Sequence, residues 1–121
     1  MCVRSLTVFR IAAIAAIRKT VRDRTHVATT AGYGPRFLHS TGQLHKGGPK
    51  TGIFLQVVQD DARDVPIPGQ PFSFSVLKQS QSLGDLKSLS SRRLPVLRVT
   101  LGREPAAGWK SLVAAVRSAV K

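Results

Sequence analysis

The second half of the chain holds two short runs of apolar and β-branched residues, separated by a proline-rich loop and a helical pattern. The first run, GIFLQVV at 52–58, predicts a buried strand. The second run, PVLRVTL at 95–101, predicts a strand that ends at Gly102. If each helix is a crossover, the two strands are parallel, and the order strand, helix, strand, helix predicts an α/β fold.

Helix signals flank the second strand on both sides. Ser73 can cap a helix that runs to about Ser90. The apolar residues of this helix that are available for burial are Val76, Leu77, Leu83, Leu86 and Leu89. Pro105 suits the first turn of a last helix, with Glu104 near its positive end. One face of that last helix carries, at helical spacing, Trp109, Leu112, Val113, Val116 and Val120.

The first 22 residues carry five basic side chains and no acidic one. Apolar residues recur among them at helical spacing, so 1–22 is predicted as a basic amphipathic helix. Its uncharged apolar run, 11–17, is far shorter than the roughly 20 residues that a membrane span needs. An ordinary helix packed on a partner element, a mitochondrial-type presequence and a surface-binding helix all fit this pattern.

Composition limits the class of protein further. The chain has 121 residues, with 19 Lys or Arg against six Asp or Glu, so its formal net charge is +13. The single cysteine, Cys2, excludes an internal disulfide and a cysteine-based zinc site, and it suits a reducing, cytoplasmic compartment.

The positive charge also fits a small basic protein that binds nucleic acid or an anionic membrane. Against this alternative, the chain has only seven aromatic residues and no visible nucleic-acid motif. We therefore expect neither a nucleic-acid partner nor a membrane span.

Residues 23–52 form a section rich in glycine that holds His39 and His45. This composition disfavours long regular structure and favours backbone turns close to a ligand. A phosphate-binding P-loop is rejected, because Gly48 and Pro49 separate its glycines from the lysine and hydroxyl that must follow directly. A metal site is disfavoured too, since no nearby carboxylate completes the histidine pair.

Two interpretations of this section stay open. In one it is a structural glycine loop. In the other it is a site for a sugar phosphate or a carbonyl compound, in which Lys46 supplies positive charge. Neutral hydrogen bonds would then come from the glycine amides and from Ser40, Thr41 and Gln43.

Three stretches of the chain resemble a known family. They are GYGPRFLHSTGQLHKGGPKTGIFLQVV, DVPIPGQPFSFSVLKQSQSLGDLKSL and VLRVTLG. Together they resemble the C-terminal end of bacterial phosphoglucose isomerase, especially the form fused behind a transaldolase in bifunctional transaldolase/phosphoglucose isomerase proteins. The resemblance covers about residues 20–121, and its core, HSTGQLHKGGP, is far more specific than a lone glycine motif.

The resemblance implies an α/β unit of the sugar isomerase type and a reaction that interconverts glucose 6-phosphate and fructose 6-phosphate without a metal or redox cofactor. It implies that Lys46 lies at the active site and assists ring opening or stabilises developing negative charge. The residues that it implies as lining or supporting the site are His39, Ser40, Thr41, Gln43 and His45.

The family's catalytic glutamate and its phosphate-binding Ser/Thr cluster belong to sequence upstream of the matched part. We therefore expect the chain to be a fragment that is inactive alone, with residues 53–121 as its strand-helix-strand-helix section. Its expected partners are a sugar phosphate and the upstream part of a split isomerase.

Overall fold

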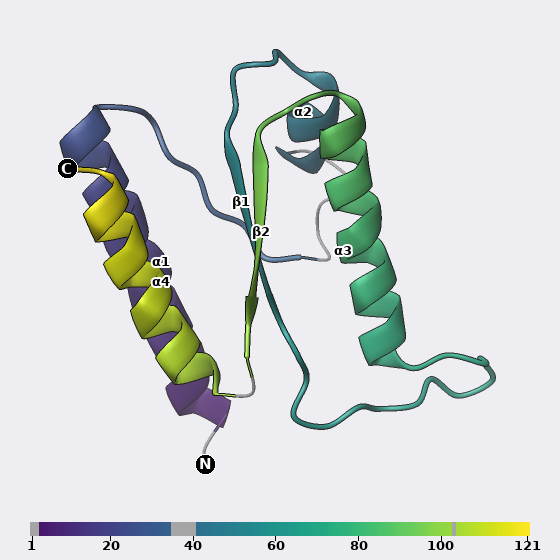
Figure 1. The fold of residues 1–121 in the computed structure, drawn as a ribbon. Coiled ribbons are helices and arrows are strands. Elements are labelled where there is room, and N and C mark those ends of the chain that lie inside the picture. Colours follow the sequence, from purple (N-terminus) through teal and green to yellow (C-terminus); the bar gives the residue numbers. More distant parts are fainter. Residues whose placement is uncertain (1–2, 35–40, 103) are drawn as a thin grey trace. The chain divides into compact units, whose positions relative to one another are not determined.

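The computed structural model describes residues 3–34, 41–102 and 104–121, which form four helices and a two-stranded parallel sheet (Figure 1). The elements are α1 (Val3–Thr25), α2 (Thr41–Gly47), β1 (Phe54–Gln59), α3 (Phe74–Ser91), β2 (Val96–Leu101) and α4 (Pro105–Ala119). This confirms a small α/β fold with parallel strands and an N-terminal helix. The chain divides into unit 1, Met1–Ala31 with Glu104–Lys121, and unit 2, Gly32–Arg103.

The sheet of unit 2 pairs β1 with β2 in parallel, from Phe54 opposite Val96 to Gln59 opposite Leu101. A parallel pair cannot be joined by a tight hairpin, so the chain must cross back between the strands. The loop after β1 and helix α3 make this crossover. Of the strand residues, Leu101 is the most deeply buried, with 2% of its surface exposed.

The two faces of the sheet differ in polarity. Side chains alternate along a strand, so Gln56 shares one face with its partner Arg98, and Leu55 shares the other with Leu97. The polar face meets α3, where the side-chain amide of Gln56 donates to the Ser82 carbonyl oxygen at 2.8 Å. The prediction of a buried first strand is wrong, because no residue of β1 is buried and Leu55 keeps 40% of its surface exposed. Two strands are too few to enclose each other.

Helix α3 begins as its sequence predicts. Ser73 is the N-cap, and its hydroxyl oxygen accepts a hydrogen bond from the Val76 amide at 3.3 Å. Of the five apolar residues expected to be buried, only Leu89 is, whereas Val76 and Leu83 are about half exposed. Polar side chains take part of the sheet-facing side of the helix, because Ser82 contacts the strands there.

The loop before α3 contains a tight turn at the PIPG motif. The Gln70 amide donates to the Ile67 carbonyl oxygen at 3.1 Å, and Gly69 has a φ of 74°. Pro68 in the second position and a left-handed glycine in the third are the pattern of a type II turn. A side chain at the third position would be strained, so this glycine is required by the backbone.

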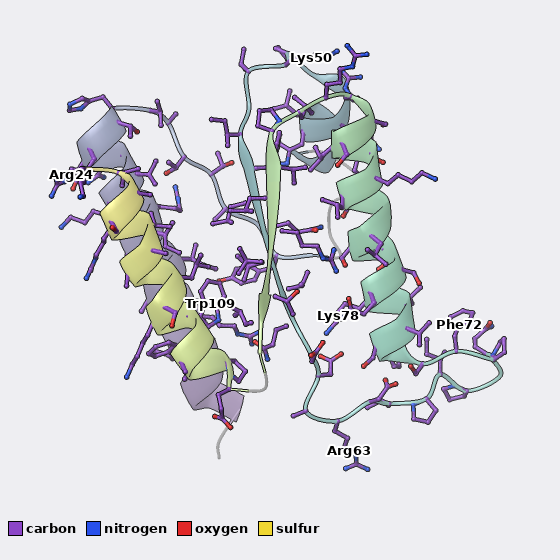
Figure 2. All side chains as sticks on the ribbon, viewed as in Figure 1. Arg24, Lys50, Arg63, Phe72, Lys78 and Trp109 are labelled. Atoms are coloured by element: carbon purple, nitrogen blue, oxygen red, sulfur yellow. The ribbon has the colours of Figure 1, made fainter. Side chains whose placement is uncertain are left out.

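Two carboxylates fasten this loop to the first turns of α3. Asp64 accepts hydrogen bonds from the amides of Val65 (2.8 Å) and Ser75 (3.0 Å). Asp61 accepts one from the Ser75 hydroxyl (2.7 Å) and pairs with Lys78 at 2.6 Å (Figure 2). A hydrogen bond from the Ser73 hydroxyl is the largest cause that lowers the pKa of Asp64 to about 2, and the amides of Ser75 and Val65 add to it. The hydrogen bond from Lys78 is the largest cause that lowers the pKa of Asp61.

Unit 1 consists of α1 and α4, which lie side by side and run in the same direction (Figure 1). Among its described residues, Ala13 of α1 and Trp109 and Leu112 of α4 are buried. The other three residues of the predicted apolar face of α4, Val113, Val116 and Val120, are half-buried. Helix α1 extends beyond the predicted end at residue 22, and Arg18 then holds the following segment by donating to the Thr29 carbonyl oxygen at 2.9 Å. No described helix combines the length and apolar character that crossing a membrane requires.

Acid should loosen the Asp64 attachment. The ordinary pKa of 3.8 falls to about 2 on folding, so the stabilisation is complete above pH 3.8 and is lost as the pH falls towards 2. We expect Asp64→Asn to be less stable than wild type near neutral pH and to lose less stability between about pH 5 and pH 2. Urea unfolding midpoints across this range measure the difference.

Asp60→Asn is the matched control, because it removes the same charge from the same loop at an exposed position. It should follow the wild-type pH dependence more closely than Asp64→Asn does. Parallel curves for wild type and Asp64→Asn would contradict the stabilising role of this carboxylate.

Candidate active site around α2

Helix α2 carries four of the six candidate residues, from Thr41 to Lys46. Thr41 is its first residue, Gln43 is exposed, and His45 and Lys46 are half-buried in its last turn. His39 and Ser40 lie outside the described residues. The prediction of turns in this section did not include this short helix.

Gly48 ends α2 and allows the chain to leave it. Its amide donates to the Leu44 carbonyl oxygen at 2.8 Å. A β-carbon at Gly48 would lie 2.5 Å from that oxygen and 2.9 Å from Leu44 Cδ1, which is closer than real side chains come. Pro49 follows and cannot continue a helix, so the GGP part of the motif determines where α2 stops.

Lys46 forms an ion pair with Asp85 of α3. The Lys46 Nζ lies 2.5 Å from Asp85 Oδ1, and the two side chains are only 20% and 15% exposed. This pair joins the HKGG and LGDL segments of the sequence. An ion pair at this depth is less screened than a surface pair, and removal of one partner leaves a charge that water reaches poorly.

A second contact joins the same two helices. Arg92, which caps the C-terminus of α3, donates from Nη2 to the Gly48 carbonyl oxygen at 3.3 Å. This oxygen belongs to the turn that ends α2. The lysine pair and the arginine contact together hold α2 against the last two turns of α3.

His45 packs against the first residue of β1. Its ring lies edge-on to the ring of Phe54, with centroids 5.1 Å apart and an interplanar angle of 68°. Gly52 leaves room for the Phe54 ring, since a β-carbon at Gly52 would lie 2.8 Å from Phe54 Cζ. The candidate residues therefore gather at the amino end of β1 and come from helices, whereas ligands in open α/β sheets usually meet the loops at the carboxyl ends of strands.

The structure brings His45 and Lys46 together with two residues that the sequence did not single out, Asp85 and Arg92. The LGDL motif contributed to the resemblance, but nothing in its spacing predicts that its carboxylate meets Lys46. No sequence pattern marks Arg92 as part of a site, because it stands next to another arginine at the end of a helix.

A groove of about 300 Å³ lies in unit 1, between α1 and α4. Phe9, Ala13, Trp109 and Val113 form most of its apolar wall, and Lys110 and Arg117 add positive charge. None of the candidate residues lines it. Among the described residues, no group of three or more His, Cys, Asp and Glu side chains could hold a metal ion.

Comparisons with protein-family models, curated proteins and solved structures gave no match to this chain. The site is therefore interpreted from its own chemistry. That chemistry is a half-buried ammonium group held by a carboxylate, next to an imidazole ring, on a short helix that ends in glycines.

A double-mutant cycle should show coupling between Lys46 and Asp85. We expect Asp85→Asn to lower the free energy of unfolding by about 1–3 kcal/mol, because it removes the carboxylate that pairs with the half-buried ammonium group of Lys46. Lys46→Met should remove much of this cost when both changes are combined. Urea unfolding of the four proteins gives the coupling energy.

The exposed pair of Arg22 and Asp23 is the control. Its side chains are 63% and 46% exposed, so Asp23→Asn should change stability by less than about 0.5 kcal/mol. Additive effects of the Lys46 and Asp85 substitutions would show that their contact contributes nothing to the fold.

Proposed function

We propose that this chain is one part of a sugar-phosphate isomerase of the phosphoglucose isomerase type and that Lys46 is its contribution to the reacting centre. The observation that carries the proposal is the ion pair between Lys46 and Asp85. It joins two of the segments on which the resemblance rests, HSTGQLHKGGP and LGDL, although they are far apart in the chain.

The proposed role of Lys46 follows from the chemistry of the reaction. Conversion of an aldose to a ketose removes a proton from C2 and returns one to C1, through an enediolate whose oxygens carry negative charge. An ammonium group held next to such an oxygen stabilises it more in the transition state than in the ground state. Asp85 would hold Lys46 in place until the oxygen develops its charge.

The base for the C2 proton would come from another part of the isomerase. Of the six acidic residues, Asp23, Asp61 and Asp85 are in ion pairs, and Asp64 accepts hydrogen bonds from the amides of Val65 and Ser75. The other two, Asp60 and Glu104, are exposed. Proton abstraction needs a carboxylate within hydrogen-bond reach of the substrate carbon.

The isolated chain should therefore have no measurable isomerase activity. The purified 121-residue protein is mixed with fructose 6-phosphate, and formation of glucose 6-phosphate is followed by a coupled dehydrogenase assay. We expect a rate equal to that of the blank. Substantial turnover would refute the view that the base lies elsewhere.

Complementation tests the proposal directly. A phosphoglucose isomerase shortened by the segment that this chain resembles is combined with the chain, and turnover is measured. We expect the wild-type chain to restore turnover. With Lys46→Met, the restored turnover should be lower by about 100-fold or more, because loss of one group that stabilises an oxyanion lowers the rate by about this much.

Lys50→Met is the matched control, because this lysine lies exposed just beyond the turn that ends α2 (Figure 2). It should restore turnover as well as wild type. Co-purification of each variant with the shortened enzyme separates a loss of catalysis from a loss of association. Equal restoration by Lys46→Met would remove Lys46 from the mechanism.

A further inference from the structure

Arg98 of β2 reaches across the polar face of the sheet to α3. Its Nη1 donates to Gln56 Oε1 at 2.8 Å and to Ser82 Oγ at 3.2 Å. Its Nη2 donates to Gln79 Oε1 at 3.4 Å. The arginine is half-buried, and all three acceptors are neutral.

No carboxylate compensates the charge of Arg98. The described ion pairs of the chain use Arg22, Lys46 and Lys78, and each of these has its own aspartate. All six acidic residues of the sequence lie in the described part of the chain, and none pairs with Arg98. A half-buried cation without a counter-charge is costly unless a ligand supplies one.

The acceptors of Arg98 are themselves held in place. The Gln56 amide donates to the Ser82 carbonyl oxygen at 2.8 Å, which turns its Oε1 towards the arginine. The Ser82 hydroxyl donates to the Gln79 carbonyl oxygen at 3.0 Å, so its lone pairs are left for the guanidinium. These bonds orient the guanidinium and leave its charge unchanged.

Part of the guanidinium remains available. It carries five N–H donors, and three of them bond to the residues named above. The Nε–H has no acceptor among the described residues, and Nε is not among the buried polar atoms that lack a partner, so solvent reaches it. Nη2 carries a second N–H beyond the one that bonds to Gln79. Two neighbouring donors on one planar fork match two oxygens of a phosphoryl group.

We propose that Arg98 is a binding residue for a phosphoryl dianion, held ready by Gln56, Gln79 and Ser82. Ser82 and Asp85 are three residues apart on α3, so they lie on the same side of the helix. The Arg98 site is therefore close to the Lys46 pair. The identification of the ligand as a sugar phosphate rests on the proposed function, but phosphate binding at Arg98 does not.

Phosphate-dependent stability tests the site. Thermal unfolding of the 121-residue chain is measured with increasing inorganic phosphate, and sodium chloride keeps the ionic strength constant. We expect the wild-type Tm to rise by about 5 °C when phosphate is about ten times its dissociation constant. Arg98→Gln should lose most of this rise, and so should Arg98→Lys, because a point charge cannot reproduce the fork.

Arg63→Gln is the matched control. This arginine lies exposed in the loop after β1, and its side chain extends away from the rest of unit 2 (Figure 2). The substitution lowers the net charge as much as Arg98→Gln does, so it should keep the wild-type rise in Tm. An equal loss in both variants would show that phosphate acts only on the general charge of the chain and would overturn the proposal.

A measurement on the wild-type chain does not depend on how the variants fold. In nuclear magnetic resonance titrations with inorganic phosphate, the signals of Arg98, Gln79 and Ser82 should shift and saturate together. Shifts without saturation, spread over the exposed lysines and arginines, would overturn the proposal.

Glucose 6-phosphate and glucose separate this inference from the proposed function. If both hold, glucose 6-phosphate stabilises the chain and glucose does not, Arg98→Gln loses this stabilisation, and Lys46→Met fails to restore turnover in the complementation assay. If Arg98→Gln abolishes the phosphate effect but Lys46→Met restores turnover in the complementation assay as well as wild type does, the Arg98 site stands and the proposed role of Lys46 fails. If phosphate stabilises Arg98→Gln as well as wild type, the Arg98 site fails.

Discussion

The parallel pairing of β1 with β2 determines where the candidate side chains of unit 2 lie. A parallel pair forces the chain to return along one face of the sheet, so α3 must run back beside the strands. Its last turns then reach α2, where Asp85 meets Lys46. Its middle turn lies over β2, where Ser82 meets Arg98. Both polar contacts therefore depend on the same crossover.

The contacts of the acidic residues show how little of the net charge of +13 is compensated within the chain. Asp23, Asp61 and Asp85 each pair with a cation, and Asp64 fastens a loop, so few carboxylates are left for the other basic residues. Most of those residues are exposed, and water solvates an exposed cation at little cost. Arg92 and Arg98 are half-buried instead, and the described partners of both are neutral, but only Arg98 bonds to three side chains.

The elements of the second half could be predicted to within about two residues because their signals are local. The hydroxyl of Ser73 marks the start of α3, and Pro105 marks the start of α4. Burial was predicted less well. Leu55 and Leu83 have the composition of core residues, but how much of each is covered depends on which elements pack against it, and periodicity does not carry that information.

By itself the sequence determined the α/β class, from the order of its strands and helices, and the residues at which α3 and α4 begin. Local backbone preferences and hydrogen bonds between near neighbours decide these features. Only the tertiary structure decided that Lys46 pairs with Asp85 and that Arg98 is held by neutral groups. Contacts between distant segments depend on strand register and on how a crossover helix lies, and both are set by the packing of the whole unit.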